Sequence, residues 1–317
     1  MSRLIAITGA TGFAGGHAVS ALLGRGYRLR ALVRAPARAK LPAAVERIEG
    51  DLDQADALGR LAEGADTIVH LAGAISALTA REFHRVNGRG TVAVAEAARH
   101  AGVARFIHVS SLSAREPALS DYGASKRAGE DAVAALVEPL NAVILRPPAV
   151  YGAGDRATLP LIRELTRPVA VIPGHPDARF SLIHVADLGR IIADCVENGI
   201  RGLHEISDGT AGGYGWPDLL RIAEARLGGR IRAVYLPRAV PAAVAVAAGW
   251  ISQATGKPGM ISSGKIAELY HRDWVTRGSP LDRADSIRFA AGFTETLKWY
   301  RDAGWLPPAR RGDTSGP

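Results

Sequence analysis

Short apolar runs alternate with helical patterns along roughly the first two hundred residues of the chain. The runs typical of strands cover residues 3–8, 28–33, 45–52, 66–73 and 105–109. A helical pattern follows the first run as far as about Arg25, and another covers residues 81–101. This alternation predicts βαβ units, and therefore an α/β protein built on a doubly wound parallel sheet.

A glycine-rich turn, Gly9-Ala-Thr-Gly12-Phe-Ala-Gly15-Gly16, joins the first strand to the first helix. Glycines spaced by three let the backbone bend, let a pyrophosphate approach the amides and let the helix pack closely on the sheet. The helix N-terminus then faces the phosphates. We therefore predict a dinucleotide site in a Rossmann-type fold. Its turn contacts come from Gly9, Thr11, Gly12, Phe13 and Ala14.

Arg34 ends the second strand, about twenty residues beyond the glycines, where NAD-binding units usually carry an acidic residue. A guanidinium can bind a 2′-phosphate through two hydrogen bonds. Arg34, with Arg38 as a helper, therefore favours NADP(H) over NAD(H). The alternative interpretation is a solvated arginine at a strand end.

The third and fourth strands end in further candidate cofactor contacts, because ligands of such sheets bind beyond the carboxyl ends of the strands. These candidates are Asp51, Leu52, Leu71, Ala72 and Gly73. His70 is interpreted as a packed strand residue, since no second ligand stands at helical or hairpin spacing from it. We predict no metal site.

Tyr122 and Lys126 stand four residues apart on a predicted helix that follows Ser110-Ser111. Side chains with this spacing project from one helical face. The ammonium can stabilise a phenolate and lower the tyrosine pKa from near 10. We therefore predict that Tyr122 donates a proton near neutral pH.

In this order and spacing, the glycine turn, Asp51-Leu52, Asn87, Ser110-Ser111 and Tyr122-x-x-x-Lys126 resemble the extended short-chain dehydrogenase/reductase family. The resemblance covers almost the whole chain, and residues 145–155 and 180–187 are similar to two later family segments.

This resemblance implies a catalytic set of Ser111, Tyr122 and Lys126, in which Lys126 also holds the nicotinamide ribose. It adds Val109, Pro147 and Val150 to the cofactor contacts, together with Tyr122 and Lys126 themselves. Ser110 stays the alternative to Ser111. Asn87 is left outside the catalytic set, because pairing within its own helix is an equal interpretation to ordering water or backbone near the site.

Composition excludes several classes of protein. The single cysteine, Cys195, rules out an intramolecular disulfide, and we interpret it as a core thiol in a reducing, cytoplasmic protein. The N-terminus runs directly into a strand, without the pattern of a signal peptide. Although the net charge is +8, the basic residues are scattered, so we expect no nucleic-acid partner. An anionic cofactor, an acidic substrate or an anionic membrane surface fits the charge better.

The family includes nucleotide-sugar epimerases and dehydratases, ketone reductases and 3β-hydroxysteroid dehydrogenases, so departures from each pattern indicate the substrate. Ala149 stands where many sugar-nucleotide members carry an asparagine, and Leu112-Ser113 where dehydratases tend to carry an acidic pair. An apolar stretch over 235–251 is either a buried packing helix or a lipid-admitting or membrane-surface segment.

We therefore expect NADPH-dependent reduction of a ketone, or the reverse alcohol oxidation, on a hydrophobic substrate such as a keto-sphingoid base, an oxidised ceramide or a steroid. The protein would meet this substrate as a peripheral protein at an anionic membrane surface. A nucleotide-sugar epimerase or dehydratase is the first alternative. A non-catalytic NADPH-binding accessory subunit, similar to that of respiratory complex I, is the alternative of another class.

The predicted organisation is a Rossmann domain over 1–172, to which 180–207 returns, and a smaller mixed substrate lobe mainly over 173–306. Residues 297–305 resemble the closing helix of the family, and 307–317 form a loose tail. The resemblance also implies a homodimer through helices near 91–101 and 122–138.

Overall fold

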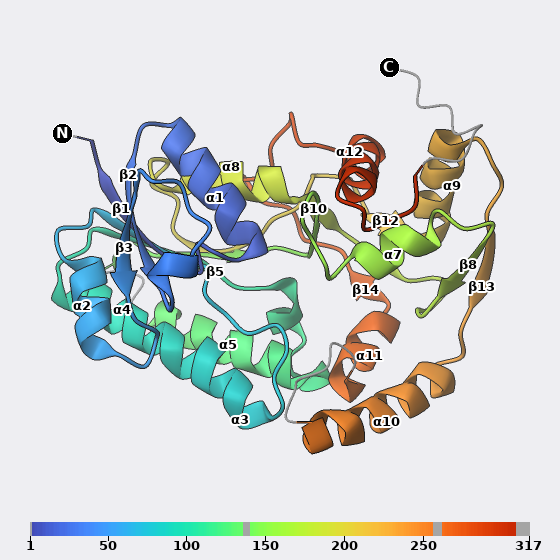
Figure 1. Cartoon of the computed structure of the whole chain (residues 1–317), viewed down its shortest axis with the longest axis horizontal. Helices are drawn as coiled ribbons and strands as arrows, with labels where there is room; N and C mark the ends of the chain where they lie inside the picture. Colours follow the sequence, from blue (N-terminus) through green and yellow to red (C-terminus); the bar gives the residue numbers. More distant parts are fainter. Residues whose placement is uncertain (1, 136–139, 256–261, 309–317) are drawn as a thin grey trace.

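The computed structural model describes residues 2–135, 140–255 and 262–308 (Figure 1). Its main sheet has seven parallel strands in the order β11-β6-β5-β4-β1-β2-β3. These strands are β1 (Leu4–Thr8), β2 (Arg28–Val33), β3 (Val45–Glu49), β4 (Thr67–His70), β5 (Arg105–Val109), β6 (Val143–Arg146) and β11 (Gly202–Glu205). The order reverses at β1, so the predicted doubly wound sheet is confirmed.

Helices cover both faces of this sheet (Figure 1). One face carries α1 (Phe13–Gly24) and α8 (Val185–Cys195), and the other carries α2 (Ala55–Ala62), α4 (Gly90–His100) and α5 (Asp121–Ala134). Alternation along β1 explains the two cores, because Ile5 and Ile7 face α1 and α8 while Leu4 and Ala6 face α2 and α4. All four side chains are buried.

The helix predicted over 81–101 is divided into three parts. Two α-helices, α3 (Ala80–Phe83) and α4, flank a π-helical segment, His84–Arg89. The Thr91 hydroxyl donates to the Asn87 carbonyl oxygen at 2.7 Å, and Gly88 and Gly90 weaken the helical preference here. The third strand is also shorter than predicted, since β3 ends at Glu49 and Asp51 Oδ1 accepts a hydrogen bond from the Asp53 amide at 3.0 Å.

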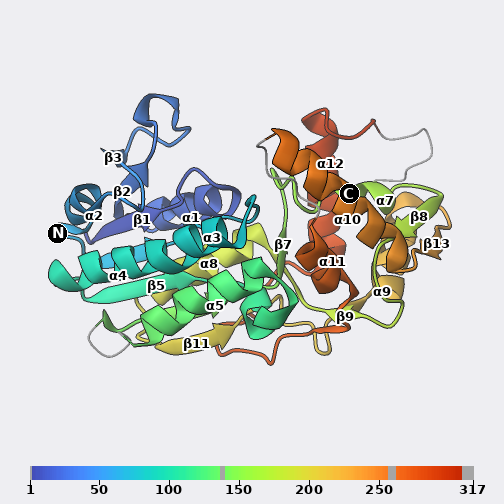
Figure 2. The same cartoon turned by 90° about the horizontal axis from the view of Figure 1, so that it is seen from below.

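A smaller mixed lobe lies beside the sheet (Figure 2). Its strands are β8 (Val169–Ile172), β9 (Arg179–Phe180), β12 (Tyr214–Gly215), β13 (Arg232–Tyr235) and β14 (Asp273–Trp274), and its helices are α7 (Leu159–Glu164), α9 (Trp216–Leu227), α10 (Ala239–Thr255), α11 (Ser263–Tyr270) and α12 (Phe289–Asp302). Buried aromatic side chains, among them Tyr151, Trp216, Phe289 and Tyr300, fill its core. A parallel pair, β7 (Ala149–Tyr151) with β10 (Leu182–His184), leads toward this lobe.

The later segments depart from two predicted bounds. Residues 159–172 were expected in the Rossmann domain, but α7 and β8 pack into the core of the smaller lobe. β11 joins the main sheet beside β6, and Cys195 in α8 is fully buried, which raises the pKa of its thiol to about 12. The closing helix, α12, begins eight residues before the predicted Leu297 and ends at Asp302. Most of the predicted tail, 309–317, lies outside the described residues. Among the described helices, none has both the length and the apolar character needed to cross a membrane.

Gly15 and Gly16 in α1 offer a matched test of the turn's packing. A Cβ at Gly15 would lie 2.0 Å from the Gly9 carbonyl oxygen, whereas one at Gly16 would meet no heavy atom within 4 Å. Gly15→Ala should therefore lower the free energy of unfolding by about 2 kcal/mol or more. Gly16→Ala should raise it by up to about 1 kcal/mol, because alanine favours a helix interior. Urea denaturation measures both, and equal effects would contradict the packing.

Candidate active site

The glycine turn fits against the end of β4. Gly9 has φ +75°, and a Cβ there would lie 2.6 Å from the Ala72 amide nitrogen. The Gly12 amide donates to the Gly9 carbonyl oxygen at 3.0 Å, and Gly12 is the N-cap of α1. The structure thus brings the predicted turn and the predicted 71–73 segment together. A backbone free of side chains beside a helix N-terminus suits a pyrophosphate.

Lys126 is buried where β5 ends. Its side chain is 5% exposed, and its Nζ donates to the Val109 carbonyl oxygen at 2.9 Å. A Cβ on Gly73 would lie 3.8 Å from the same nitrogen. Three predicted positions, on α5, on β5 and after β4, therefore meet at one point.

Tyr122 lies one turn before Lys126, in a helix that Ser120 caps by accepting a hydrogen bond from the Gly123 amide at 2.9 Å. The Ser111 hydroxyl hydrogen-bonds to the Tyr122 side chain and lowers its pKa. The Ser110 hydroxyl is buried and has no hydrogen-bond partner among the described residues. The Phe83 ring packs edge-on against Tyr122, with ring centroids 6.0 Å apart. This geometry favours Ser111 over Ser110 as the partner of Tyr122.

The predicted lowering of the Tyr122 pKa by Lys126 is wrong for this structure. Burial raises the pKa of Tyr122 to about 12, the Ser111 hydrogen bond opposes that rise, and the carboxylate of Glu268 adds to it. Burial also lowers the pKa of Lys126 to about 8, against the attraction of Glu130. Because the ammonium is directed at the Val109 carbonyl, it does not offset the burial of the phenol. Tyr122 is consequently held in its protonated form, that of a proton donor.

Asn87 orders backbone beside this pair. It is 1% exposed, and its Nδ2 donates to the Ala74 carbonyl oxygen at 3.0 Å and to Ser125 Oγ at 2.9 Å. Its Oδ1 accepts from the Ala74 amide at 2.8 Å. The side chain therefore ties the segment after β4 to α5. Of the two interpretations left open by the sequence, the structure shows the ordering of backbone near the site.

His70 is the packed strand residue that the sequence predicted. Its Nδ1 lies 2.7 Å from Thr8 Oγ1, and its Nε2 lies 3.0 Å from Thr91 Oγ1. Since Thr91 donates its own proton to Asn87, it accepts from Nε2, and Nδ1 accepts from Thr8. Burial lowers the pKa of His70 to about 3, so the ring is neutral. The chain Thr8–His70–Thr91 fastens β1, β4 and α4 behind the site.

Arg34 and Arg38 lie exposed just beyond β2, next to the strand that carries the glycine turn. Neither has a carboxylate partner within the part of the chain that the structure describes. Two unneutralised guanidinium groups at this edge favour an anion. Three of the remaining predicted contacts also lie beyond strand ends, Asp51 and Leu52 after β3 and Pro147 after β6, whereas Val150 lies within β7.

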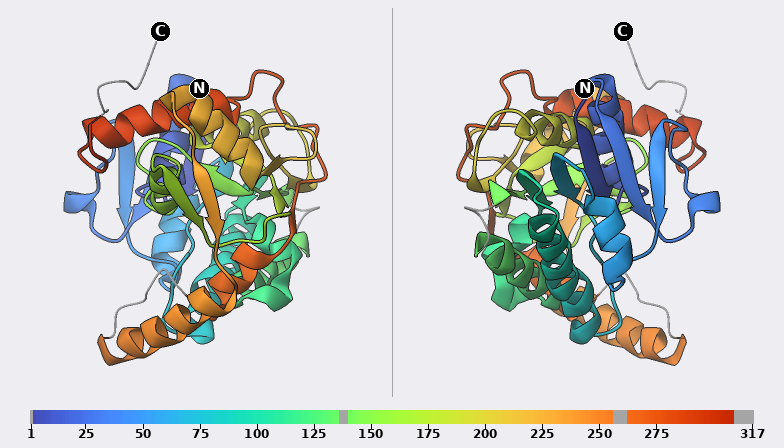
Figure 3. Two further views of the ribbon diagram at one scale, coloured as in Figure 1. Left: turned by 90° about the vertical axis from the view of Figure 1, so that its right-hand side faces the viewer. Right: turned by 90° about the vertical axis from the view of Figure 1, so that its left-hand side faces the viewer.

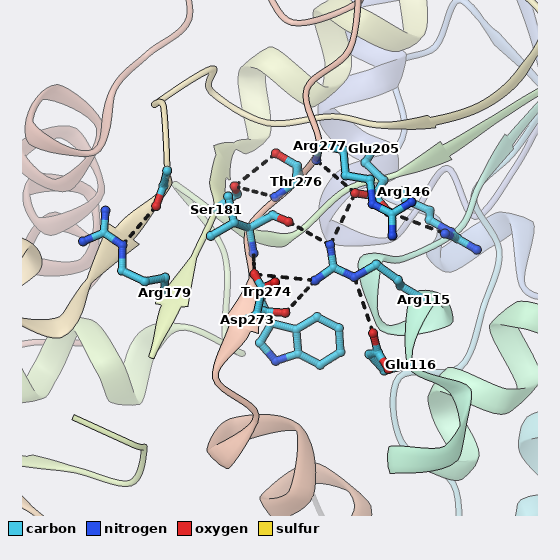
Figure 4. Close-up of polar contacts among 12 residues, drawn as sticks. Arg115, Glu116, Arg146, Arg179, Ser181, Glu205, Asp273, Trp274, Thr276 and Arg277 are labelled. Carbon is cyan, nitrogen blue, oxygen red and sulfur yellow. Dashed lines mark hydrogen bonds and ion pairs between the residues drawn. The ribbon is translucent and has the colours of Figure 1, made fainter. Parts of the chain in front are cut away.

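An unpredicted contact joins the site to the lobe through Arg115, four residues after Ser111 (Figure 4). Its guanidinium donates to the Val275 carbonyl oxygen at 2.7 Å and lies 3.4 Å from Glu205 Oε2. The same carboxylate oxygen accepts from the Arg277 amide at 3.1 Å. Segment 273–277 is thereby held against the loop that carries Ser111.

A series of ion pairs connects Glu205 to α5, the helix that carries Tyr122. Arg146 Nη1 lies 3.6 Å from Glu205 Oε1, and Arg146 donates to both carboxylate oxygens of Glu130, at 2.8 and 2.6 Å. Glu130 is one turn after Lys126 in α5. The sequence signal for this series of ion pairs was a charged residue at the end of each of two neighbouring strands, Arg146 in β6 and Glu205 in β11.

Comparison with known proteins identifies the family. Residues 5–205 match the model of the NAD dependent epimerase/dehydratase family. The chain belongs to this family. It is a nicotinamide-dinucleotide-dependent oxidoreductase of the extended short-chain dehydrogenase/reductase type, as the motifs predicted.

Individual relatives of this family member differ in their named activities. The chain is 45% identical over 312 residues to the ceramide reductase of Caulobacter vibrioides, covering 96% of each chain. It is 29% identical over 242 residues to a 3 beta-hydroxysteroid dehydrogenase/Delta 5-->4-isomerase of Mycobacterium tuberculosis, covering 67% of this chain and 63% of that one. Its fold is similar to that of dTDP-glucose 4,6-dehydratase DesIV from Streptomyces venezuelae, solved with NAD bound, with a TM-score of 0.67 and 22% identity over 97% of this chain and 100% of DesIV.

Glu268 offers a test of the electrostatics at Tyr122. Its carboxylate raises the pKa of Tyr122, so Glu268→Gln should lower that pKa. A proton donor acts only below its pKa, and the alkaline limb of the pH–rate profile should therefore move to lower pH in the direction in which Tyr122 donates. The profile of kcat/KM measures this shift.

Glu116→Gln is the control, because Glu116 is a half-exposed carboxylate near Arg115 that does not shift the pKa of Tyr122. A movement toward higher pH in Glu268→Gln, or the same movement in both variants, would contradict the assignment.

Proposed function

We propose that this protein uses NADPH to reduce a ketone on a hydrophobic, lipid-like molecule, or oxidises the corresponding alcohol. The observation that carries the proposal is the geometry of Tyr122, which is hydrogen-bonded to Ser111 and lies one helical turn from the buried Lys126. Such a group can donate a proton to an oxygen on which negative charge develops. The nicotinamide supplies the hydride when bound.

Each residue has a distinct role in this proposal. Tyr122 donates its proton to the ketone oxygen, and Ser111 hydrogen-bonds to the same oxygen. Lys126 holds the nicotinamide ribose, and it can stabilise the negative charge left on the Tyr122 oxygen only if its ammonium turns away from the Val109 carbonyl that it contacts in this structure. Asn87 and Glu130 act as positioning residues, through the backbone at Ala74 and through the charge beside Lys126.

The residues at the carboxyl ends of β1 and β2 fit the dinucleotide. The turn carries no side chain at Gly9 or Gly12, and the N-terminus of α1 follows it. Arg34 and Arg38 carry the preference for NADP(H), because exposed guanidinium groups without carboxylate partners suit a 2′-phosphate.

The substrate class rests on the relatives and on one position of the chain. A relative named ceramide reductase is 45% identical over nearly the whole length, which supports an oxidised ceramide or a keto-sphingoid base, and the steroid dehydrogenase is more distant. Ala149 offers no side-chain hydrogen bond to a nucleotide sugar. Two expectations from the sequence are proposed with this function, a cytoplasmic location and a homodimer through the regions near 91–101 and 122–138.

The deciding experiment measures NADPH oxidation by the purified protein with detergent-dispersed ketones, including an oxidised ceramide. We expect one NADPH consumed per ketone reduced. Tyr122→Phe should abolish turnover while NADPH still binds, because only the proton donor is removed. Ser111→Ala should lower kcat by about 10²-fold.

Ser110→Ala is the matched control and should keep nearly full activity. Conversion of a nucleotide sugar without net NADPH consumption would favour an epimerase instead. Binding of NADPH without oxidation in the presence of any ketone would favour the accessory-subunit alternative. An unchanged rate in Tyr122→Phe would refute the role of Tyr122.

Arg34→Asp tests the cofactor preference separately. An acidic side chain at the end of β2 can accept hydrogen bonds from ribose hydroxyls and repels a 2′-phosphate. The ratio of kcat/KM for NADPH over NADH should fall by about 10²-fold or more. Arg30→Ala is the control, since Arg30 donates to the Glu63 carbonyl oxygen at 2.6 Å rather than facing the strand end. An unchanged ratio in Arg34→Asp would leave Arg34 as a solvated surface residue.

A further inference from the structure

Helix α10 has the reverse of the usual arrangement of apolar residues. Four of its large side chains that the structure describes point outward: Val240, Val244, Val246 and Trp250 are 49%, 51%, 56% and 73% exposed. Its inward positions are small, with Pro241 buried and Ala245 only 4% exposed. A helix on the surface of a globular protein normally buries its large apolar side chains and exposes polar ones. The outward face of α10 therefore lacks the apolar surroundings that its side chains favour.

This face is part of a larger concentration of exposed apolar residues. Among the described residues, ten large hydrophobic side chains are exposed, and seven of them belong to β8, β13 and α10. The strand residues are Val169, Val171 and Val234, and Val171 lies opposite Val234 in the β8–β13 pair. Because β13 leads directly into α10, one chain segment carries most of this exposed surface. Concentrations of this kind mark interaction sites.

In the sequence, the segments on either side of α10 contain more basic than acidic residues, although the exposed carboxylates of Asp177, which acts on Tyr235 of β13, and Asp273 lie close to them. Residues 239–255 contain no charged side chain, whereas residues 228–272 as a whole contain six basic residues and one acidic residue. The basic residues are Arg230, Arg232, Arg238, Lys257, Lys265 and Arg272. The acidic residue, Glu268, is buried and paired with Lys265 at 3.2 Å. An uncharged apolar face with cationic flanks complements the interface of a bilayer that contains anionic lipid.

The position of α10 suits such a contact. Both views of Figure 3 show α10 at the lower edge of the molecule, away from the main sheet. The helix packs against α11, and a Cβ on Gly264 of α11 would lie 2.8 Å from the Ser120 Cβ. Ser120 caps the helix of Tyr122 and donates to Glu268 of α11. The outward face of α10 is thus linked through a single helix to the proton donor.

We propose that the outward face of α10, Val240, Val244, Val246 and Trp250, docks on an anionic lipid bilayer. The helix lies in the plane of the interface, with Trp250 at the level of the headgroups and the basic flanks on the lipid phosphates. The inference deepens the proposed function, on which its link to a lipid substrate rests. Docking would place α11, which contacts the cap of the Tyr122 helix, next to the membrane that holds a water-insoluble ketone.

Vesicle co-sedimentation of the purified full-length protein tests this proposal without any substrate. The protein should sediment with phosphatidylcholine vesicles that contain phosphatidylglycerol, and less with phosphatidylcholine alone. Added salt should weaken the binding, because it screens the basic flanks. The double variant Val244→Ser/Trp250→Ser should lower the partition coefficient by about tenfold or more.

Leu203→Ser is the matched control, because Leu203 is 44% exposed in β11, outside this surface. Trp250→Phe gives a second readout, since it should remove the blue shift of tryptophan fluorescence that anionic vesicles cause. Circular dichroism and thermal unfolding verify that each variant folds.

Several results would overturn the proposal: no binding to anionic vesicles, equal binding to both kinds of vesicle, or equal loss in Leu203→Ser. A double variant that binds vesicles normally but dissociates a dimer in light scattering would assign the face to a second copy instead. If vesicles bind and dispersed ketones are not reduced, only the proposed function fails; if ketones are reduced and vesicles do not bind, only the docking face fails.

Discussion

The burial of one ammonium group constrains the whole site. Lys126 is almost inaccessible to water, and its Nζ is held by the Val109 carbonyl oxygen at 2.9 Å, which fixes α5 against the end of β5. Burial of a charge costs free energy, as the lowering of the Lys126 pKa to about 8 shows. Glu130, one turn further along α5, offsets part of that cost. A fold selected for stability alone would place an apolar side chain here, so the position of this lysine reflects function.

Each buried charge in this region is paired with a neighbour of opposite charge, which has a further charged partner of its own. Glu130 is itself buried and takes two hydrogen bonds from Arg146, and Arg146 shares the carboxylate of Glu205 with Arg115. Removing any one of these side chains would leave a buried charge without its partner and would strongly destabilise the fold. Since Arg115 also holds the Val275 carbonyl, the neutralisation of one helix extends to the C-terminal lobe. The Ser111 loop is consequently fixed from both sides, by the sheet and by the lobe.

Sequence patterns were sufficient to predict the features of the fold that depend on residues close together in the chain. The five predicted strands, the glycine turn and the one-turn spacing of Tyr122 and Lys126 follow from periodicity and from backbone geometry, and the structure has each of them, with β3 and β4 ending earlier than predicted. The pKa of Tyr122 was not predictable, because it depends on burial and on Glu268, a residue far away in the sequence. The link from Arg115 to Glu205 escaped prediction for the same reason. The π-helical segment before α4 coincides with a hydrogen bond from the Thr91 side chain to the Asn87 carbonyl, which periodicity does not reveal.

Helix α10 shows a different limit of sequence reasoning. The apolar composition of residues 235–251 predicted a helix that is either buried or in contact with lipid, and composition alone could not distinguish these. The distinction depends on which face packs inward, and that face follows from contacts with other elements such as α11, which the composition of the helix does not show. With Ala245 inside and Trp250 outside, packing in the monomer leaves the larger apolar side chains in water. Their burial can stabilise the protein only in contact with a second apolar phase, for which the basic flanks favour an anionic bilayer.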